Sequence, residues 1–366
     1  MPSNSLLFEP IQVGNITLKN RVIMAPMTRS RSLQPGDIPY DLNALYYQQR
    51  ANAGLIIAEA TQVSRQGQGY AYTPGVYTQV QVEGWQKVTS AVHNTGGKIA
   101  LQLWHVGRMS HRSLQQDNAQ PIAPSAIKAN AKTFVSDGNG GGYMTDTDAP
   151  RAMLKEDIID VIKQFAQGAE NAMKAGFDLV EVHGGNGYLF EQFQSTNTNH
   201  RTDQYGGSVE NRARFLLETV DELVNVVGAN RIGVRLSPWS TISDIHDEEP
   251  EAMVLYLADE LMKRNIAYLH IAEWAWAGVG GAYPERFREK LRKAFANTLI
   301  LCGGYTAESA TSMLDAKLAD AIAFGRPFIA NPDFVKRIQE SAPLAEPKPE
   351  FFYGGAAEGY TDYPTL

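Results

Sequence analysis

The amino-acid sequence predicts an α/β fold, a (β/α)₈ TIM barrel, in a single domain that spans residues 1–366. Three observations predict this fold class. Eight short apolar runs recur along the chain, amphipathic helical segments separate many of them, and no dinucleotide-binding glycine motif follows any run. A chain of this length could hold two domains, but barrels of alternating strands and helices often reach it as one.

The eight apolar runs have the composition of strands that are covered on both faces. Residues 54–59 (GLIIAE) and 98–103 (KIALQL) are nearly continuous in apolar side chains, which is typical of parallel sheets. The expected strands are Val22–Ala25, Leu55–Ala58, Ile99–Leu103, Leu179–Val182, Ile232–Leu236, Tyr268–Ile271, Leu299–Leu301 and Ala321–Phe324.

Helical periodicity fills much of the sequence between these strands. Lys155–Ala175 places Ile158, Ile162 and Phe165 on one face and is followed by Gly176, a residue that often ends helices. Similar patterns predict helices at Val209–Val227, Pro250–Asn265, Lys290–Phe295 and Ala307–Ala316. An open Rossmann sheet is the alternative, and the missing glycine fingerprint favours the barrel.

The longest gap between expected strands separates the third from the fourth, at about residues 105–150. It contains a glycine-rich turn at residues 138–143, between polar and β-branched stretches. We expect an inserted hairpin that forms a lid over the barrel mouth; a disordered surface loop is the alternative. The C-terminal tail, residues 351–366, is rich in Gly, Tyr and Pro and should be irregular.

Composition limits the classes of partner. The formal charge is −7 and no dense Lys/Arg run occurs, which argues against nucleic acid or an anionic membrane as the main partner. Cys302 is the only cysteine, so we expect no intramolecular disulfide, iron–sulfur cluster or cysteine-based zinc site, and no metal. The sequence has no apolar run of membrane-spanning length and no signal-peptide pattern at Met1, so a cytoplasmic location is expected. It leaves the oligomeric state open.

In barrels of this type the functional site lies at the carboxyl ends of the strands. Gly303 and Gly304 follow the seventh expected strand, and Gly325 and Arg326 follow the eighth. Open backbone N–H groups and a guanidinium at these positions predict a phosphate site. Alternatively, the glycines form tight turns and Arg326 pairs with a surface carboxylate.

Other strand ends suit the edge of a flat, hydrogen-bonding ring. Gln102 can both donate and accept hydrogen bonds. Arg235 ends an apolar strand, where an unpaired charge is costly, so an anion or an electron-rich ring edge would stabilise it. Thr28 can donate its hydroxyl to such a ring and tune its electronics; a helix N-cap is the alternative for this residue.

The densest chemical signal is the segment from His183 to Tyr188, HGGNGY. Its glycines allow the loop to fold back on itself. His183 and Asn186 could then donate hydrogen bonds to one substrate oxygen, while Tyr188 supplies a proton. A turn with a capped histidine and a core tyrosine is the alternative.

An ordered series of motifs resembles the old yellow enzyme family of FMN-dependent ene-reductases from one end of the chain to the other. The motifs are Leu7-Phe-Glu-Pro10, Asn20-Arg-Val22, Met24-Ala-Pro-Met-Thr-Arg29, Glu59-Ala-Thr61, Gln102-Leu-Trp-His-Val-Gly-Arg108, His183-Gly-Gly-Asn-Gly-Tyr188, Asn199–Ser208, Glu210-Asn-Arg212, Phe324-Gly-Arg326 and Glu358–Pro364.

The resemblance implies roles for residues at these positions. Flavin-ring contacts would come from Pro26, Met27, Thr28, Ala60, Gln102 and Arg235, and phosphate contacts from Gly303, Gly304, Gly325 and Arg326. The substrate oxygen would be held by His183 and Asn186, with Tyr188 as proton donor. The aromatic walls of the substrate pocket would be Tyr70, Trp276 and Tyr353, with Trp104 close by.

The resemblance also implies an activity. NADPH or NADH would supply hydride through FMN to the C=C bond of an α,β-unsaturated carbonyl compound or a nitroalkene. Two alternatives stay open: a reductase of nitrate esters or nitroaromatics that uses the same flavin, and a non-catalytic flavin redox sensor.

Two positions distinguish branches within the family. Thr28 stands where one branch carries Cys, so the chain resembles the branch without that cysteine. Asn186 stands where several bacterial members carry His. Because an amide does not titrate, we expect substrate binding to depend less on pH than it does with a pair of histidines.

Overall fold

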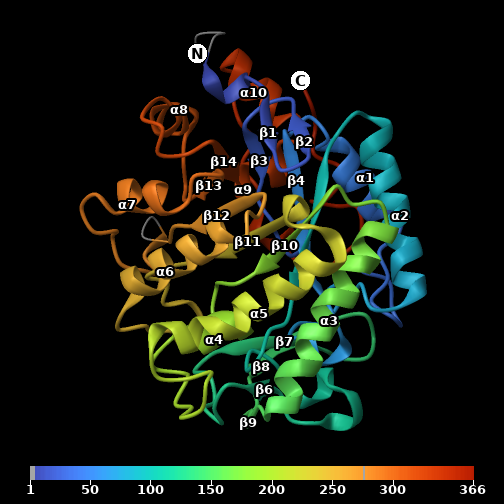
Figure 1. Cartoon of the computed structure of the whole chain (residues 1–366). Coiled ribbons are helices and arrows are strands. Elements are labelled where there is room, and N and C mark those ends of the chain that lie inside the picture. Colours follow the sequence, from blue (N-terminus) through green and yellow to red (C-terminus); the bar gives the residue numbers. More distant parts are fainter. Residues whose placement is uncertain (1–4, 275–276) are drawn as a thin grey trace.

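The computed structural model describes residues 5–274 and 277–366, and its core is a closed barrel of eight parallel strands (Figure 1). The eight expected strands are all present, and the predicted fold class is confirmed. In the order in which they neighbour one another around the barrel, the strands are β3 (Val22–Met24), β4 (Leu55–Gln62), β5 (Ile99–Trp104), β10 (Leu179–His183), β11 (Ile232–Leu236), β12 (Tyr268–Ala272), β13 (Thr298–Cys302) and β14 (Ala321–Phe324). Strand β14 pairs with β3 and closes the ring.

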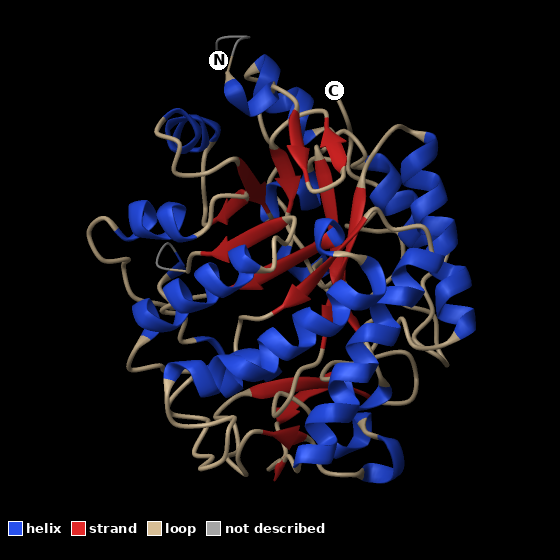
Figure 2. Ribbon diagram, viewed as in Figure 1, coloured by secondary structure: helices blue, strands red, loops and turns tan. Residues whose placement is uncertain are grey.

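Helices surround the strands (Figure 2). The longer ones are α1 (Asp41–Gln49), α2 (Gln79–Asn94), α3 (Lys155–Lys174), α5 (Val209–Val227), α6 (Pro250–Lys263), α7 (Phe287–Ala294) and α8 (Ala307–Asp315). The shorter ones are α4 (Leu189–Gln194), α9 (Arg326–Ala330) and α10 (Phe334–Glu340). Single 3₁₀ turns are η1 (Leu6–Phe8), η2 (Arg65–Gly67), η3 (Arg112–Leu114), η4 (Gln116–Asn118), η5 (Ala229–Arg231), η6 (Ile242–Asp244) and η8 (Pro349–Phe351). In the described ranges, none of the helices is long and apolar enough to cross a bilayer.

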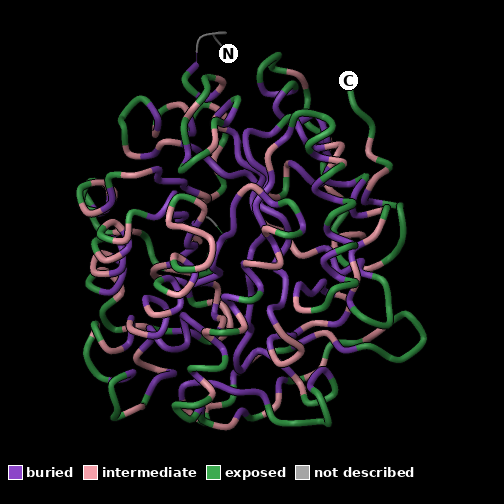
Figure 3. The backbone as a smooth tube through the Cα atoms, turned by 45° about the vertical axis from the view of Figure 1, so that its right-hand side comes forward, coloured by how far each residue is buried: buried purple, intermediate pink, exposed green. Residues whose placement is uncertain are grey.

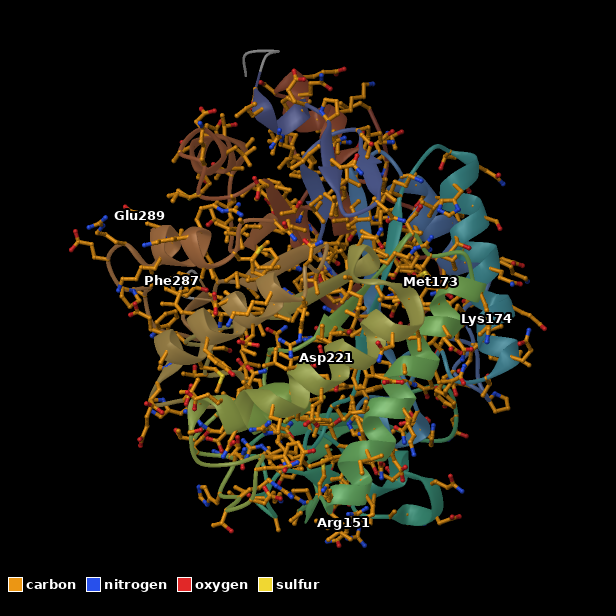
Figure 4. All side chains as sticks on the ribbon, in the orientation of Figure 1. Arg151, Met173, Lys174, Asp221, Phe287 and Glu289 are labelled. Atoms are coloured by element: carbon orange, nitrogen blue, oxygen red, sulfur yellow. The ribbon has the colours of Figure 1, made fainter. Side chains whose placement is uncertain are left out.

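Helix α7 begins at Phe287, earlier than the expected Lys290. Arg286, in the left-handed conformation at φ 61°, marks its start, and Phe287 is only 1% exposed and packs edge-on against the Trp239 ring at 4.7 Å. Glu289 faces solvent instead (Figure 4). The buried face therefore extends one turn further than the apolar pattern of the sequence indicates.

A short hairpin closes the amino-terminal end of the barrel. Strands β1 (Ile11–Val13) and β2 (Ile16–Leu18) pair antiparallel, and Val13 and Leu18 are fully buried against the inward-facing residues of the barrel strands. Figure 3 shows the buried stretches concentrated in the centre of the molecule and the exposed ones on the outer loops. Because this end is sealed, the space for a ligand lies at the carboxyl ends of the strands.

The segment between β5 and β10 carries a hairpin where the sequence predicts one. Strands β7 (Lys132–Ser136) and β8 (Gly142–Asp146) pair antiparallel, and β6 (Ile122–Ala123) pairs with β9 (Arg151–Ala152) beside them. The Tyr72 hydroxyl donates to the Gly141 carbonyl at 2.6 Å and lies 2.8 Å from the Ser136 hydroxyl, so it ties the hairpin tip to the loop after β4. In Figure 1 this hairpin lies at the opposite end of the molecule from both chain termini.

The last residues of the chain form turns rather than helix or strand, and two buried arginines hold them. Arg29 donates to the carbonyls of Phe352 at 2.9 Å and Gly359 at 3.0 Å. Arg31 donates to the carbonyl of Phe351 at 3.0 Å, and its guanidinium lies over the Tyr360 ring. The tail is therefore fixed against the loop that follows the first barrel strand.

Candidate active site

A cavity of about 1020 Å³ opens at the carboxyl ends of the barrel strands. Its walls come from the loop after β3, the β7–β8 hairpin, the loops after β13 and β14, and the C-terminal tail. The residues of the sequence-predicted site that line it are Pro26, Met27, Thr28, Tyr70, Tyr188, Arg235, Gly304, Gly325, Arg326 and Tyr353.

Thr28 lies in the cavity wall and is not the N-cap of the helix that follows, since α1 begins only at Asp41 after Tyr40. Ala60 stands back from this wall, 6% exposed, in an apolar cluster with Trp104. The pairing of β4 with β5 shifts register between Ala58 and Thr61, and such irregularities often occur next to functional sites because they redirect a strand.

Gln102 lies at the floor of the barrel interior in a polar network. Its Nε2 donates to Glu181 Oε1 at 2.7 Å, and His270 Nδ1 lies 2.8 Å from the other oxygen of the same carboxylate. All three side chains are at most 1% exposed. The carboxylate engages the Gln102 Nε2 group, so the amide oxygen of Gln102 is the atom available as an acceptor. Glu181 and His270 were not predicted as site residues, although both carry polar atoms within otherwise apolar strands.

Arg235 supplies the positive charge in this interior. It is 5% exposed, lines the cavity, and its Nε is buried without a hydrogen-bond partner in the described part of the chain. An unsatisfied buried donor on a charged group is costly, so the site suits an electron-rich ligand edge.

The loops after β13 and β14 form the opposite wall. Gly304, at φ 71°, lines the cavity with Gly325 and Arg326. Gly303 stands behind them, where a Cβ atom would lie 2.8 Å from Cβ of Glu273. The close approach to Glu273 requires glycine at residue 303, and the expected phosphate contacts from this wall stay predictions.

The side chains of the HGGNGY segment gather beside the aromatic residues. The rings of His183 and Tyr188 are 5.0 Å apart, and the rings of Trp104 and Tyr188 are 4.9 Å apart. Tyr70 stacks on Trp104 at 5.8 Å. The structure thus brings His183 and Tyr188 together with Tyr70 and Trp104, because the ends of β4, β5 and β10 are neighbours.

The environment sets the protonation of the two groups expected to act on substrate. Burial, followed by the charges of Arg235 and His270, lowers the pKa of His183 well below 6.5. Desolvation, followed by the neighbouring Tyr70, raises the pKa of Tyr188 well above 10. At neutral pH His183 is therefore a neutral hydrogen-bond donor and Tyr188 keeps its proton.

Asn186 has its side-chain amide oriented by an indole. Trp274 Nε1 donates to Asn186 Oδ1 at 3.0 Å, and since an indole N–H can only donate, the accepting atom must be the amide oxygen. The group that Asn186 presents as a donor is therefore Nδ2. Trp274 also lines the cavity and was missed by the sequence analysis, whereas the expected Trp276 lies outside the described residues.

Tyr353 is 67% exposed and stands at the rim of the cavity on the C-terminal tail. The neighbouring Phe352 also lines the cavity. The tail thus forms part of the entrance, as the resemblance implies for Tyr353, whereas Phe352 was not expected there.

These residues fit FMN, the cofactor that the sequence resemblance implies. The cavity is at the upper end of the usual size for small-molecule sites, and its interior offers an unpaired guanidinium donor at Arg235 and an amide acceptor at Gln102. Residues 5–274 and 277–366 contain no group of three metal-ligating side chains.

Comparison with known proteins agrees with this fit. Residues 6–345 match the NADH:flavin oxidoreductase / NADH oxidase family. The chain is 43% identical to putative 12-oxophytodienoate reductase 5 of Oryza sativa subsp. japonica, over 96% of this chain and 92% of the rice protein. Morphinone reductase matches with a TM-score of 0.97 at 53% identity, covering 99% of this chain and 97% of that one. The old yellow enzyme homologue of Zymomonas mobilis matches with a TM-score of 0.94 at 41% identity, covering 98% of this chain and 99% of that one. The chain therefore belongs to the NADH:flavin oxidoreductase / NADH oxidase family, and within it to the old yellow enzymes.

Proposed function

We propose that this protein reduces the C=C bond of α,β-unsaturated carbonyl compounds or nitroalkenes, with hydride from NADPH or NADH and FMN as its cofactor. Its family relatives are named as reductases of 12-oxophytodienoate and morphinone, and morphinone reductase has been solved with tetrahydroNAD bound. The observation that supports the proposal is the surroundings of Tyr188 in the cavity wall: His183 is in ring contact with Tyr188, and Asn186 accepts a hydrogen bond from Trp274, which lines the same cavity.

Bound FMN would supply the redox chemistry by accepting a hydride from the nicotinamide and passing it to the substrate. Arg235, Gln102 and Thr28 would hold its ring. Gly304, Gly325 and Arg326 would hold its phosphate, since they line the same cavity from the loops after β13 and β14.

The protein's own part of the reaction is to hold one oxygen and deliver one proton. His183 and the Nδ2 amide of Asn186 would donate hydrogen bonds to the activating oxygen of the substrate. Negative charge then develops on that oxygen opposite donors that are already in place, which lowers the barrier. Tyr188 would protonate the α carbon, and its raised pKa keeps it in the donating form at every physiological pH.

An anaerobic two-step mixing experiment tests the proposal. The purified FMN-loaded protein is first mixed with NADPH or NADH until its flavin absorbance bleaches, and then with cyclohexenone. The expected result is rapid bleaching followed by rapid return of the flavin absorbance, with one saturated ketone formed per flavin. A protein that bleaches but is reoxidised only by oxygen would be a redox sensor rather than an ene-reductase.

The same experiment with a nitroaromatic acceptor addresses the other enzymatic alternative. Faster reoxidation by the nitro compound than by any enone would move the assignment to that reaction. We also propose a cytoplasmic location, and the single cysteine supports it, because many secreted proteins are stabilised by disulfides.

A further inference from the structure

A buried carboxylate lies directly behind the loop that carries Asn186. Glu191 stands on α4, one turn after Tyr188, and is 6% exposed. It does not line the large cavity, and the reaction described above does not use it. A buried glutamate without a guanidinium or ammonium partner is costly unless hydrogen bonds stabilise its carboxyl group.

Both oxygens of Glu191 hold the substrate-binding loop. Oε2 accepts a short hydrogen bond from the backbone N–H of Gly187. Oε1 accepts from the Ser237 hydroxyl at 2.7 Å, and that hydroxyl oxygen accepts the backbone N–H of Asn186 at 2.6 Å. One carboxylate therefore fixes two consecutive amides, the first through Ser237 and the second directly.

These amides belong to a strained part of the backbone. Asn186 has φ 57° and Gly187 has φ 80°, both in the left-handed region that a non-glycine residue adopts at a cost. Trp274 fixes the far end of the Asn186 side chain, and the Glu191–Ser237 pair fixes its backbone end. The direction of the Nδ2 amide thus depends on Glu191.

Glu191 lines a second cavity of about 210 Å³, which shares no lining residue with the cavity of the active site. Ser237 and the polar side chains of Ser240 and His246 line it as well. Water can therefore exchange a proton with Glu191 while the active site is filled.

Among the charged groups around Glu191, Asp247 favours the neutral form of the Glu191 carboxyl. Asp247 lines the same cavity and is paired with Arg212 of α5 at 2.7 Å, and His246 lies on the same wall. His105, whose carbonyl receives the Leu189 amide at the start of α4, is buried and has a pKa of about 3, so it adds no charge. No cation in the described chain pairs directly with the Glu191 carboxylate.

We propose that Glu191 is a positioning residue whose charge state sets how firmly Asn186 holds the substrate oxygen, so that substrate binding depends on pH although Asn186 does not titrate. The inference rests on the proposed function, because it assumes that Asn186 holds that oxygen. The charged carboxylate accepts both hydrogen bonds strongly, and the protonated carboxyl loses a charge-assisted acceptor.

The range in which this effect operates follows from burial. Desolvation raises the pKa of Glu191 to about 7, against the hydrogen bonds from Gly187 and Ser237, which lower it. Substrate binding should therefore weaken as pH falls through about 7. Protonation weakens these hydrogen bonds rather than removing them, and the difference between a charge-assisted and a neutral hydrogen bond corresponds to roughly 3- to 10-fold in the dissociation constant.

The test measures binding of cyclohexenone to the oxidised, FMN-loaded protein by the change in flavin absorbance, from pH 5.5 to pH 8.5. This ligand is uncharged, so its own titration does not enter. The wild-type dissociation constant should rise about 3- to 10-fold as pH falls through 7. Glu191→Gln should give a nearly flat profile with retained FMN. Glu170→Gln, which removes a partly exposed carboxylate on α3, should behave as wild type.

Ser237→Ala tests the same inference even if the Glu191→Gln variant does not fold. Without the Ser237 donor the carboxylate loses stabilisation of its charge, so the inflection should move to higher pH and binding should weaken at every pH. A flat wild-type profile, or an inflection that survives in Glu191→Gln, would overturn the inference and leave the proposed function intact. Wild-type protein that shows no flavin perturbation with cyclohexenone at any pH would overturn both.

Discussion

His183 and Tyr188 are in ring contact, yet we expect them to act at different stages of one reaction. His183→Ala should retain FMN, since other residues are expected to hold the cofactor. It should lose about 10²- to 10³-fold in enone turnover because one donor to the developing charge is gone. The measurements are flavin stoichiometry and steady-state rate with cyclohexenone. Loss of flavin together with activity would mean that His183 holds the cofactor instead.

Tyr188→Phe separates the two half-reactions. Reduction by the nicotinamide needs no proton from this residue, so its rate should be unchanged. Reoxidation by cyclohexenone should slow by about 10²-fold or more, since the α carbon loses its proton donor. Stopped-flow absorbance of the two steps checks this, and equal slowing of both would assign Tyr188 a purely structural role.

The sequence predicts which reactive side chains lie at strand ends, but it does not predict which side chains pair with one another inside the barrel. Gln102, Glu181 and His270 meet because β10 pairs with β5 in one register and β12 lies beyond β11, and a register between distant strands is not visible in local composition. The same limit explains Trp274. A loop has no periodicity that indicates which of its aromatic residues turns inward.

At the scale of elements, the β7–β8 hairpin forms part of the active-site wall through Lys132, Phe134 and Met144. Tyr72→Phe removes the hydroxyl that ties its tip to the loop after β4. One lost hydrogen bond changes the open population by about 2- to 10-fold, so KM for the nicotinamide or the enone should rise by that factor with kcat nearly unchanged. Initial-rate kinetics with both substrates measure this, and a fall in kcat alone would contradict it.

The barrel strands and several helices can be predicted because continuous apolar runs and 3.6-residue periodicity are local signals. Helix α1 is harder to predict, since its buried side chains include Asn43, Tyr46 and Tyr47, which mix polar and aromatic character. Its buried face contacts the C-terminal tail through Tyr360, whose ring stacks on Tyr46 at 4.1 Å. That contact joins segments far apart in the chain and has no local signature.

At the scale of the whole molecule, the tail contributes to stability as well as to the site. Deleting residues 351–366 would leave the buried guanidinium groups of Arg29 and Arg31 without their carbonyl acceptors, each such hydrogen bond being worth about 1.5–3 kcal/mol. We expect a large fall in Tm and loss of bound FMN. Tyr353→Ala is the matched control. It changes the rim of the cavity but keeps the hydrogen bonds from Arg29 and Arg31 to the tail, so Tm should stay close to wild type.

Global stability should also fall in mild acid because of buried neutral histidines. The pKa of His105 is lowered by burial to about 3 from its ordinary 6.5, so the unfolded chain binds this proton first. The contribution of His105 to the free energy of unfolding is therefore fully present above about pH 6.5. It falls by about 1.4 kcal/mol for each pH unit below that value, towards pH 3. Urea unfolding at pH 7.5 and pH 5 measures the decline. His105→Asn should show a smaller difference between the two, and an equal one would contradict this assignment.

Arg29 follows the first strand of the barrel and donates a hydrogen bond to the carbonyl of Phe352, 323 residues further along the chain. During translation, the residues that form the floor and most of the wall of the pocket are therefore synthesised long before the C-terminal tail that completes its entrance. Until that segment docks, a nascent barrel has an unfinished mouth with two uncompensated guanidinium groups beside it. Flavin capture should thus be a late event that follows translation, and nascent chains stalled before the tail should collect no FMN.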